Sequence, residues 1–186
     1  LENPETPVGS VCRWVDSTQE AAKRMQQLIS QMLTLADVER PDTALSMHPV
    51  DLAAIATKAA LEMESIAYEK CVTLETALPA ACILRGNPDY LQRIVSSLLE
   101  NALKYEPAGG RVQLTLTQDK RRVQLSVQNF GSTIPEEDLP HVFDRFYRSD
   151  KSRKNESGSF GLGLAITKEM VERLGGEISV SSSAED

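Results

Sequence analysis

Apolar residues recur at helical spacing along four stretches of this chain, and these stretches predict four helices. They run from Val11 to Glu39, Leu52 to Ile66, Leu91 to Tyr105 and Gly161 to Leu174. The first has an a/d-like heptad pattern, which is typical of a helix in a coiled coil or a bundle. Because a single helix of this length cannot bury its own apolar stripe, we expect it to pack on another copy of the chain or on sequence missing here. The alternative is a helix that folds back on its own domain.

Alternating apolar and polar residues predict the strands. Arg111 to Thr117 and Arg122 to Gln128 alternate strictly on either side of a polar turn, which predicts an antiparallel hairpin with one buried face. Val72 to Glu75 and Ala81 to Leu84 predict two short neighbouring strands, and Glu177 to Ser181 predicts a last one. Helices packed on one face of a mostly antiparallel sheet form a two-layer α+β domain.

The stretch RPDTALSMHP separates the first predicted helix from the second. Its two prolines cannot continue a helix, so we expect a linker there. The expected division is therefore a coiled-coil or bundle helix over residues 1–40, a linker over 41–49 and one domain over 50–186.

Composition narrows the classes of partner. The chain is 41% hydrophobic and 25% charged, as in ordinary globular proteins, and its net charge of −7 argues against a nucleic-acid binder. Any polyanionic ligand must therefore meet a local basic cluster. No apolar run approaches the roughly 18 residues of a membrane span, so we expect no membrane contact by this segment and a cytoplasmic location. Cys12, Cys71 and Cys82 lack Cys-x-x-Cys spacing, so we expect buried thiols rather than disulfides or a zinc site.

One edge of the Leu91 to Tyr105 helix carries candidate chemistry. Ser97, Asn101, Lys104 and Tyr105 follow each other at helical spacing beside the apolar stripe. An amide oxygen is a suitable hard ligand for Mg²⁺, and an ammonium one turn away could neutralise phosphate held by the same metal. Taken alone, this pattern also fits an ordinary amphipathic helix with a solvated polar face.

Two glycine-containing stretches could meet the same ligand. In NFGSTIP, Asn129 leaves a predicted strand beside Gly131, where its side chain could reach the exocyclic amine of a flat base. The alternative is a plain turn that ends a strand. In GSFGLGLAI, glycines precede a helix whose first N–H groups could face a phosphate. The ten residues from Arg145 to Lys154 supply the local basic cluster, with five basic side chains against Asp150.

Four of these stretches occur in a known order. LLENALKY, NFGSTIP, FDRFY and GSFGLGLAI resemble the N, G1, F and G2 boxes of sensor histidine kinases, over Pro49 to about Ser182. The Val11 to Glu39 helix resembles the second helix of that family's dimerisation and phosphoacceptor hairpin. NFGSTIPEEDLPHVFDRFYR is most similar to the heavy-metal-sensor-like branch. The resemblance implies a Bergerat-type, GHKL-like ATP-binding sandwich.

The resemblance also implies roles for individual residues. Asn101 would ligate Mg²⁺, and Phe143 and Phe146 would anchor a lid over the nucleotide. The implied catalytic residues are Asn101, Lys104 and Arg148. The implied ATP-binding residues are Asn101, Lys104, Tyr105, Asn129, Gly131, Thr133, Ile134, Phe146, Gly158, Gly161, Leu162 and Gly163.

The chain departs from the family pattern at the base-binding turn. Asn129 stands where the family usually has Asp, and Thr133 stands at the second glycine position. An amide can flip and also donate to a guanine oxygen, so we expect looser base selectivity than in a relative with Asp. The ratio of ATP to GTP affinity should then rise in Asn129→Asp.

The chain also lacks a family-like phosphoacceptor. His48 and His141 do not lie in a His-Glu-Leu-Arg-x-Pro context, so we expect Mg-ATP binding without stable self-phosphorylation. The resemblance implies a homodimer formed through the N-terminal helix, transfer of the γ-phosphoryl to a histidine of the dimerisation hairpin, and relay to the receiver domain of a response regulator. It further implies that the full-length protein is anchored in the membrane.

Two other functions compete. Gyrase-like or chaperone-like ATPases place a Glu one turn before the metal-binding Asn, where this chain has Ser97, a hydroxyl without basicity near neutral pH. Water activation is therefore disfavoured. A non-catalytic assembly module that has lost its nucleotide is the remaining alternative, and Asn101, Lys104 and the glycine loop argue against it.

Overall fold

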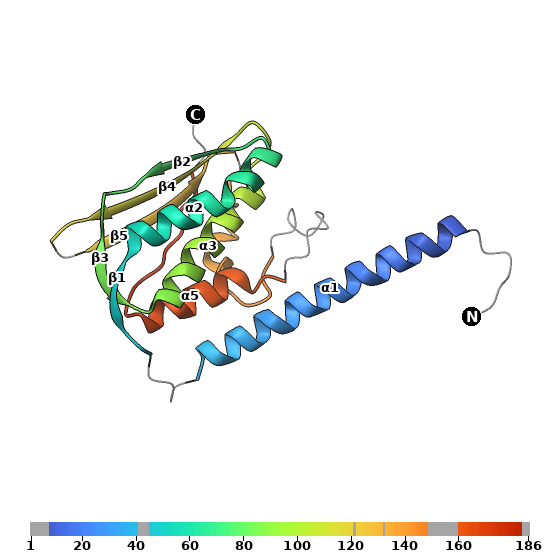
Figure 1. The fold of residues 1–186 in the computed structure, drawn as a ribbon, viewed down its shortest axis with the longest axis horizontal. Helices are drawn as coiled ribbons and strands as arrows, with labels where there is room; N and C mark the ends of the chain where they lie inside the picture. Colours follow the sequence, from blue (N-terminus) through green and yellow to red (C-terminus); the bar gives the residue numbers. More distant parts are fainter. Residues whose placement is uncertain (1–7, 41–44, 121, 132, 149–159, 184–186) are drawn as a thin grey trace.

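A long helix leads into a two-layer domain in the computed structural model (Figure 1). The structure describes residues 8–40, 45–120, 122–131, 133–148 and 160–183, with side chains from residue 14 onward. Within these ranges no helix is both long and apolar enough to cross a membrane.

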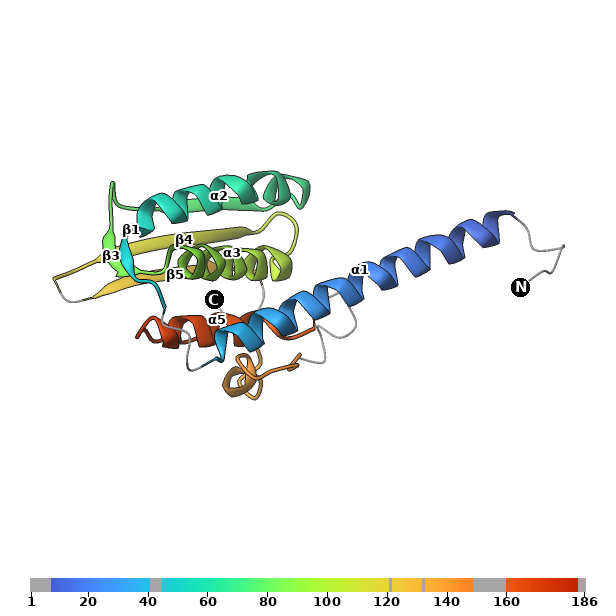
Figure 2. The same cartoon turned by 60° about the horizontal axis from the view of Figure 1, so that its bottom comes forward.

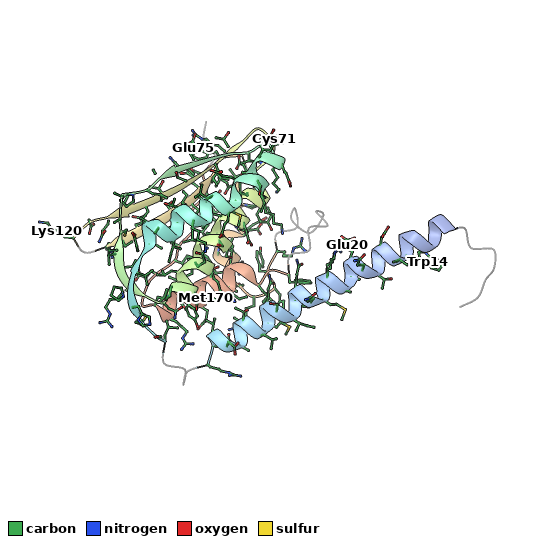
Figure 3. The ribbon with its side chains drawn as sticks, in the orientation of Figure 1. Trp14, Glu20, Cys71, Glu75, Lys120 and Met170 are labelled. Atoms are coloured by element: carbon green, nitrogen blue, oxygen red, sulfur yellow. The ribbon has the colours of Figure 1, made fainter. Side chains whose placement is uncertain are left out.

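Helix α1, Val8–Val38, extends away from the domain over most of its length (Figure 1). Figure 3 shows Trp14 far from the domain, and its side chain is 68% exposed. Only the last turns are covered, because Leu35 and Val38 are buried in a small cluster with Ile94, Leu162, Ile166 and Met170. The heptad stripe is therefore divided: its end packs on the chain's own domain, and the rest has no cover among the described residues.

The chain enters the domain through a short strand where a linker was expected. His48 and Pro49, the last residues of the expected linker, begin strand β1, His48–Asp51. Asp51 then caps α2, Leu52–Glu69, by accepting hydrogen bonds from the N–H groups of Ala53 and Ala54. The same carboxylate oxygen accepts from the Cys82 N–H at 2.9 Å, and these bonds, the one from Cys82 foremost, lower the pKa of Asp51.

The main sheet has the strand order β2-β4-β5. Strands β4, Arg111–Gln118, and β5, Val123–Asn129, form the expected antiparallel hairpin, and β2, Thr73–Ala77, pairs with β4 in parallel. The sequence predicted that β3, Ile83–Gly86, would neighbour β2, and this is wrong: β3 pairs with β1. Four-residue segments do not show their partner in their own pattern, because the pairing depends on the path of the whole chain.

Helix α3, Pro88–Tyr105, is central to the packing. Asn87 caps it by accepting from the Tyr90 N–H at 3.0 Å, and Leu99 and Leu103 are fully buried between α2 and the inward face of β4. Burying a leucine stabilises a fold by about 2 kcal/mol, so this helix face alone makes a large contribution. Figures 1 and 2 show α2 and α3 over one face of the sheet, with α5, Gly163–Arg173, beside α3.

Two further expectations are corrected. The described residues 177–183 contain no strand, although their sequence alternates. This segment instead contacts the loop after β5 through a side chain, since the Ile134 N–H donates to the Ser182 hydroxyl at 2.9 Å. A ladder needs paired backbone groups, which alternation alone does not supply. Cys71 is exposed rather than buried, whereas Cys82 is buried as expected; the Cys12 side chain lies outside the described ones.

Candidate functional site

The polar edge of α3 forms the centre of the candidate site. Asn101, Lys104 and Tyr105 are half-buried on the last turns of the helix. Lys104 Nζ lies 5.3 Å from the Tyr105 ring centroid. The end of the helix is fixed from behind by Lys70, whose ammonium donates to the carbonyls of Leu103 at 2.9 Å and Lys104 at 3.3 Å. A cation at these last carbonyls also complements the helix dipole.

Cations gather at this end of α3 in an otherwise acidic protein. Burial lowers the pKa of Lys104, and the positive charges of Arg148 and Lys70 lower it further. Arg148 follows the F box, so the structure brings the lid segment and the N box to one place. Mutually repelling cations form a site with a strong preference for a polyanion. The other cations of the predicted basic cluster, Lys151, Arg153 and Lys154, lie outside the described residues.

Helix α5 is joined to α3 at Ser97. The hydroxyls of Thr167 and Ser97 lie 3.0 Å apart, and Thr167 Oγ1 lies 2.9 Å from the Gly163 carbonyl. A hydroxyl has one proton, so Thr167 can donate to Gly163 while it accepts from Ser97. Ser97, directly before the N box, therefore links α3 to the start of the G2 helix. Its hydroxyl stands at the position where gyrase-like and chaperone-like ATPases have a Glu carboxylate.

Glu106, which was not among the residues predicted from the sequence, joins α3 to the G1 turn. Its Oε2 accepts from the N–H groups of Phe130 at 2.9 Å and Gly131 at 3.0 Å, and its Oε1 accepts from the Arg111 N–H at 3.0 Å. A signal was present in the sequence: a carboxylate at the C-terminus of a helix is opposed by the helix dipole, so it needs donors from elsewhere. These three hydrogen bonds brace the G1 turn against α3, and they place the half-buried Asn129 beside the end of that helix.

The F and G2 boxes meet through backbone groups. The Phe146 N–H donates to the Gly161 carbonyl at 2.9 Å, and both residues have positive φ, 62° and 71°. Phe146 is 57% exposed, so it holds this junction through its main chain, while Leu162 is fully buried. Left-handed φ in a phenylalanine is strained, and such strain gathers at functional segments.

The remaining candidate residues have less defined surroundings. Thr133 and Gly131 are exposed, Ile134 is half-buried at its contact with Ser182, and Phe143 is half-buried. Gly158 lies outside the described residues. Within the described part, no three His, Cys, Asp or Glu side chains gather as a metal site. A metal here would need oxygen ligands such as the Asn101 amide, together with ligand oxygens and water.

Comparison with known proteins agrees with this geometry. Residues 86–186 match the family model described as "Histidine kinase-, DNA gyrase B-, and HSP90-like ATPase". The sensor histidine kinase CusS of Escherichia coli (strain K12) is 35% identical over 168 residues, covering 90% of this chain and 35% of CusS. RppB of Synechocystis, also a sensor histidine kinase, is 32% identical over 168 residues, covering 90% of this chain and 37% of RppB.

A solved structure shares the fold. Full-length ShkA in complex with AMPPNP has a TM-score of 0.73 and 26% identity to this chain, and the match covers 88% of this chain and 34% of ShkA. The chain thus spans about a third of the length of the curated relatives that it matches. The predicted two-layer fold and the predicted resemblance, its heavy-metal-sensor-like branch included, are confirmed. The chain belongs to the family of histidine kinase-, DNA gyrase B- and HSP90-like ATPases, with sensor histidine kinases among its relatives.

Proposed function

We propose that this chain is the ATP-binding catalytic part of a sensor histidine kinase, which binds Mg-ATP and transfers the γ-phosphoryl to a histidine on a dimerisation helix. The observation that carries the proposal is the convergence of Lys104 with Arg148, because these cations lower the stability of the empty site and favour a polyphosphate. The relative ShkA was crystallised with AMPPNP, an ATP analogue, which supports the same assignment.

In this proposal, different residues contact different parts of the nucleotide. Asn129, at the end of β5, would read the base edge with its amide. Lys104 and Arg148 would neutralise the phosphate oxygens and stabilise the charge that spreads over the transferred group. The N–H groups at the start of α5 would face the triphosphate, with Gly161 and Gly163 allowing close approach. Phosphoryl transfer needs positioning and charge stabilisation above all, and these are what the residues can supply.

The donor set at α3 suits Mg²⁺. Asn101 offers an amide oxygen on a rigid, half-buried helix turn. Mg²⁺ commonly keeps several waters and takes its other ligands from phosphates, so one protein oxygen is an adequate anchor. When bound with ATP, the ion would offset negative charge on the phosphate oxygens.

Transfer to a histidine is favoured over hydrolysis. Ser97 occupies the position at which a water-activating carboxylate would be needed, and its hydroxyl lies 3.0 Å from Thr167 Oγ1. A neutral imidazole is already a nucleophile and needs only orientation. The acceptor would belong to another segment, because His48 lies in β1 and His141 ends the 3-10 helix η1, Leu139–His141, with its Nδ1 2.8 Å from Asp144 Oδ2.

We infer that the working unit is a homodimer joined through α1, and that its phosphohistidine passes the group to a response regulator receiver domain. The exposed apolar side chains of α1 support the first part. Similarity to sensor histidine kinases supports the second.

Calorimetry of this chain with ATP tests the nucleotide part of the proposal. We expect binding in Mg²⁺ that is lost in EDTA, and a loss of at least about tenfold in affinity for Asn101→Ala. Asn87→Ala removes the cap of the same helix and the hydrogen bond from Asn87 Nδ2 to the Ser46 carbonyl but no residue of the proposed site, so it should retain binding. Magnesium-independent binding, or none, would contradict the proposal.

Transfer is tested with γ-labelled ATP. A longer protein that includes an upstream acceptor helix should gain acid-labile phosphohistidine, whereas this chain alone should not. Label on His48 or His141 of the chain alone would show that the acceptor has been placed wrongly.

A further inference from the structure

Glu106 is buried in a way that few carboxylates are. Its side chain is 5% exposed, and Glu106 and Thr167 are the buried polar residues of the described part of the chain. Burying a carboxylate is costly unless its oxygens accept hydrogen bonds, and here three backbone N–H groups surround it at 2.9 to 3.0 Å. Two of the three belong to the turn that directly follows Asn129.

Two glycines make room for the carboxylate. A Cβ built on Gly110 would lie 1.9 Å from Glu106 Oε1, and one built on Gly131 would lie 2.8 Å from the same atom. The Gly131 position would also bring a Cβ within 2.4 Å of Pro107. The turn after β5 is therefore pressed against the end of α3 with no space for side chains between them.

Arg111 closes the opposite side of this turn. Its N–H donates to Glu106 Oε1, and its guanidinium carbon lies 3.8 Å from the centroid of the Phe130 ring. Phe130 is thus held by the carboxylate through its N–H and by the guanidinium through its ring. The backbone position of Phe130 depends on both contacts, and it sets the position of Asn129, the residue directly before it.

We propose that Glu106 is a positioning residue for base recognition, fixing Asn129 relative to Lys104 by bracing the turn after β5 against the end of α3. The inference rests on the proposed nucleotide site and adds a determinant of base selectivity to it. Glu106 is not a catalytic residue, because it acts through the N–H groups of Phe130 and Gly131. Because these N–H groups point at Glu106, they are not available to a base. Base discrimination therefore depends on the orientation of the Asn129 amide.

The geometry makes Gln a sharp test. Both carboxylate oxygens of Glu106 accept from backbone donors, whereas Gln has the same size but one NH₂ group in place of an oxygen. In any orientation, Glu106→Gln sets that NH₂ against a backbone N–H. Glu106→Asp keeps both acceptors but is shorter by one methylene, so it should retain part of the brace.

The experiment measures Mg-ATP and Mg-GTP affinities by calorimetry, together with amide hydrogen exchange at Phe130 and Gly131. For Glu106→Gln we expect ATP affinity to fall about tenfold, GTP affinity to fall less, and both amides to exchange faster. Glu106→Asp should give smaller changes in the same direction. Glu75→Gln is the matched control, because Glu75 lines the same cavity of about 320 Å³ as Glu106 but is exposed, and it should change none of these quantities.

The outcomes separate the two proposals. Equal losses for ATP and GTP that follow the melting temperature would show that Glu106 only stabilises the fold, and unchanged exchange at both amides would overturn the brace itself. If the unaltered chain binds no nucleotide in Mg²⁺, the proposed function fails, while the exchange rates still decide whether Glu106 orders the turn. Should Glu106→Gln not fold, Glu106→Asp carries the same comparison.

Discussion

At the scale of single residues, Gly161 joins the F and G2 boxes under two constraints. Its φ is +71°, and a Cβ there would lie 2.5 Å from the Tyr147 carbonyl oxygen and 2.8 Å from the Phe146 carbonyl carbon. Both obstacles are backbone atoms, which cannot rotate away. We expect Gly161→Ala to lower the free energy of unfolding by about 2 to 4 kcal/mol, measured by urea denaturation, and to weaken ATP binding.

Gly175 offers the matched control. It also has positive φ, +78°, but no heavy atom lies within 4 Å of its added Cβ. Gly175→Ala should therefore show only the conformational cost, about 1 kcal/mol. If the two variants lose the same stability, the close contact between the F and G2 boxes contributes nothing.

Lys104 is expected to strengthen ATP binding and to lower the stability of the fold. Its pKa lies below the ordinary value of 10.5, first because of burial and then because of Arg148 and Lys70. The unfolded chain thus binds this proton more tightly, so Lys104 destabilises the fold at neutral pH, and stability is regained as pH rises through the lowered pKa toward 10.5. We expect Lys104→Met to raise the melting temperature without nucleotide at pH 7, by up to roughly 3 °C, and to abolish most ATP binding.

The pH dependence provides the check. The gain in melting temperature should shrink between neutral pH and pH 10.5, since the unaltered lysine loses its charge there. Lys58→Met removes an exposed lysine from α2, and it should change neither quantity. A gain that persists undiminished at high pH would show that the methionine side chain, rather than the lost charge, causes it.

At the scale of elements, local pattern was enough where an element carries its own signal. The apolar stripe of α3 and the strict alternation of β4 and β5 predicted what the structure contains. The pairing of β3 with β1, and of β2 with β4, could not be predicted, because register between distant short strands depends on the fold as a whole.

The candidate site shows the same limit. Asn101 and Lys104 could be selected because they share a helix edge, and Asn129 because it ends a strand. For Glu106 the sequence carried only the general signal of a carboxylate at a helix C-terminus, and for the Ser97–Thr167 contact it carried none, because the partners of these residues lie in other elements and spacing does not identify them. Sequence spacing thus selected groups that could face a ligand, whereas the groups that hold those residues in place needed coordinates.

Helix α1 docks through one face of its last turns. Leu35 is 8% exposed within the cluster that contains Leu162 of the G2 box, whereas Leu33 is 62% exposed. Arg145 pairs with Glu39 just beyond the helix, and Arg173 donates to the Val38 carbonyl at 2.5 Å. We expect Leu35→Asp to release α1, which would appear as faster hydrogen exchange in its last turns and at Leu162.

The domain itself should remain folded in Leu35→Asp, because its main core is a separate cluster formed by α2, α3 and the sheet. Leu33→Asp should leave exchange at Leu162 unchanged and serves as the control. If both variants exchange alike, the docking seen at Leu35 does not hold the helix in solution.

At the scale of the whole molecule, the domain buries its own apolar core, whereas most of the apolar stripe of α1 is exposed. Figures 1 and 3 show most of the helix free of the domain, and it carries large apolar side chains that are at least half exposed: Trp14, Val15, Met25, Ile29, Met32 and Leu33. An apolar surface of this extent on a lone helix marks an interface with another protein segment. Most of α1 therefore offers an apolar surface against which a partner helix can pack.

We expect the chain to self-associate through this surface. Sedimentation should show an average mass that rises with concentration, and emission from Trp14, the single tryptophan, should shift to shorter wavelength as water leaves the ring. Met25→Glu with Ile29→Lys should reverse both effects, because charges in an apolar helix interface are costly. Leu61→Glu, at a similarly exposed leucine of α2, should change neither. A monomer at every concentration, with Trp14 emission unchanged, would place the partner of α1 in another segment rather than in a second copy of this chain.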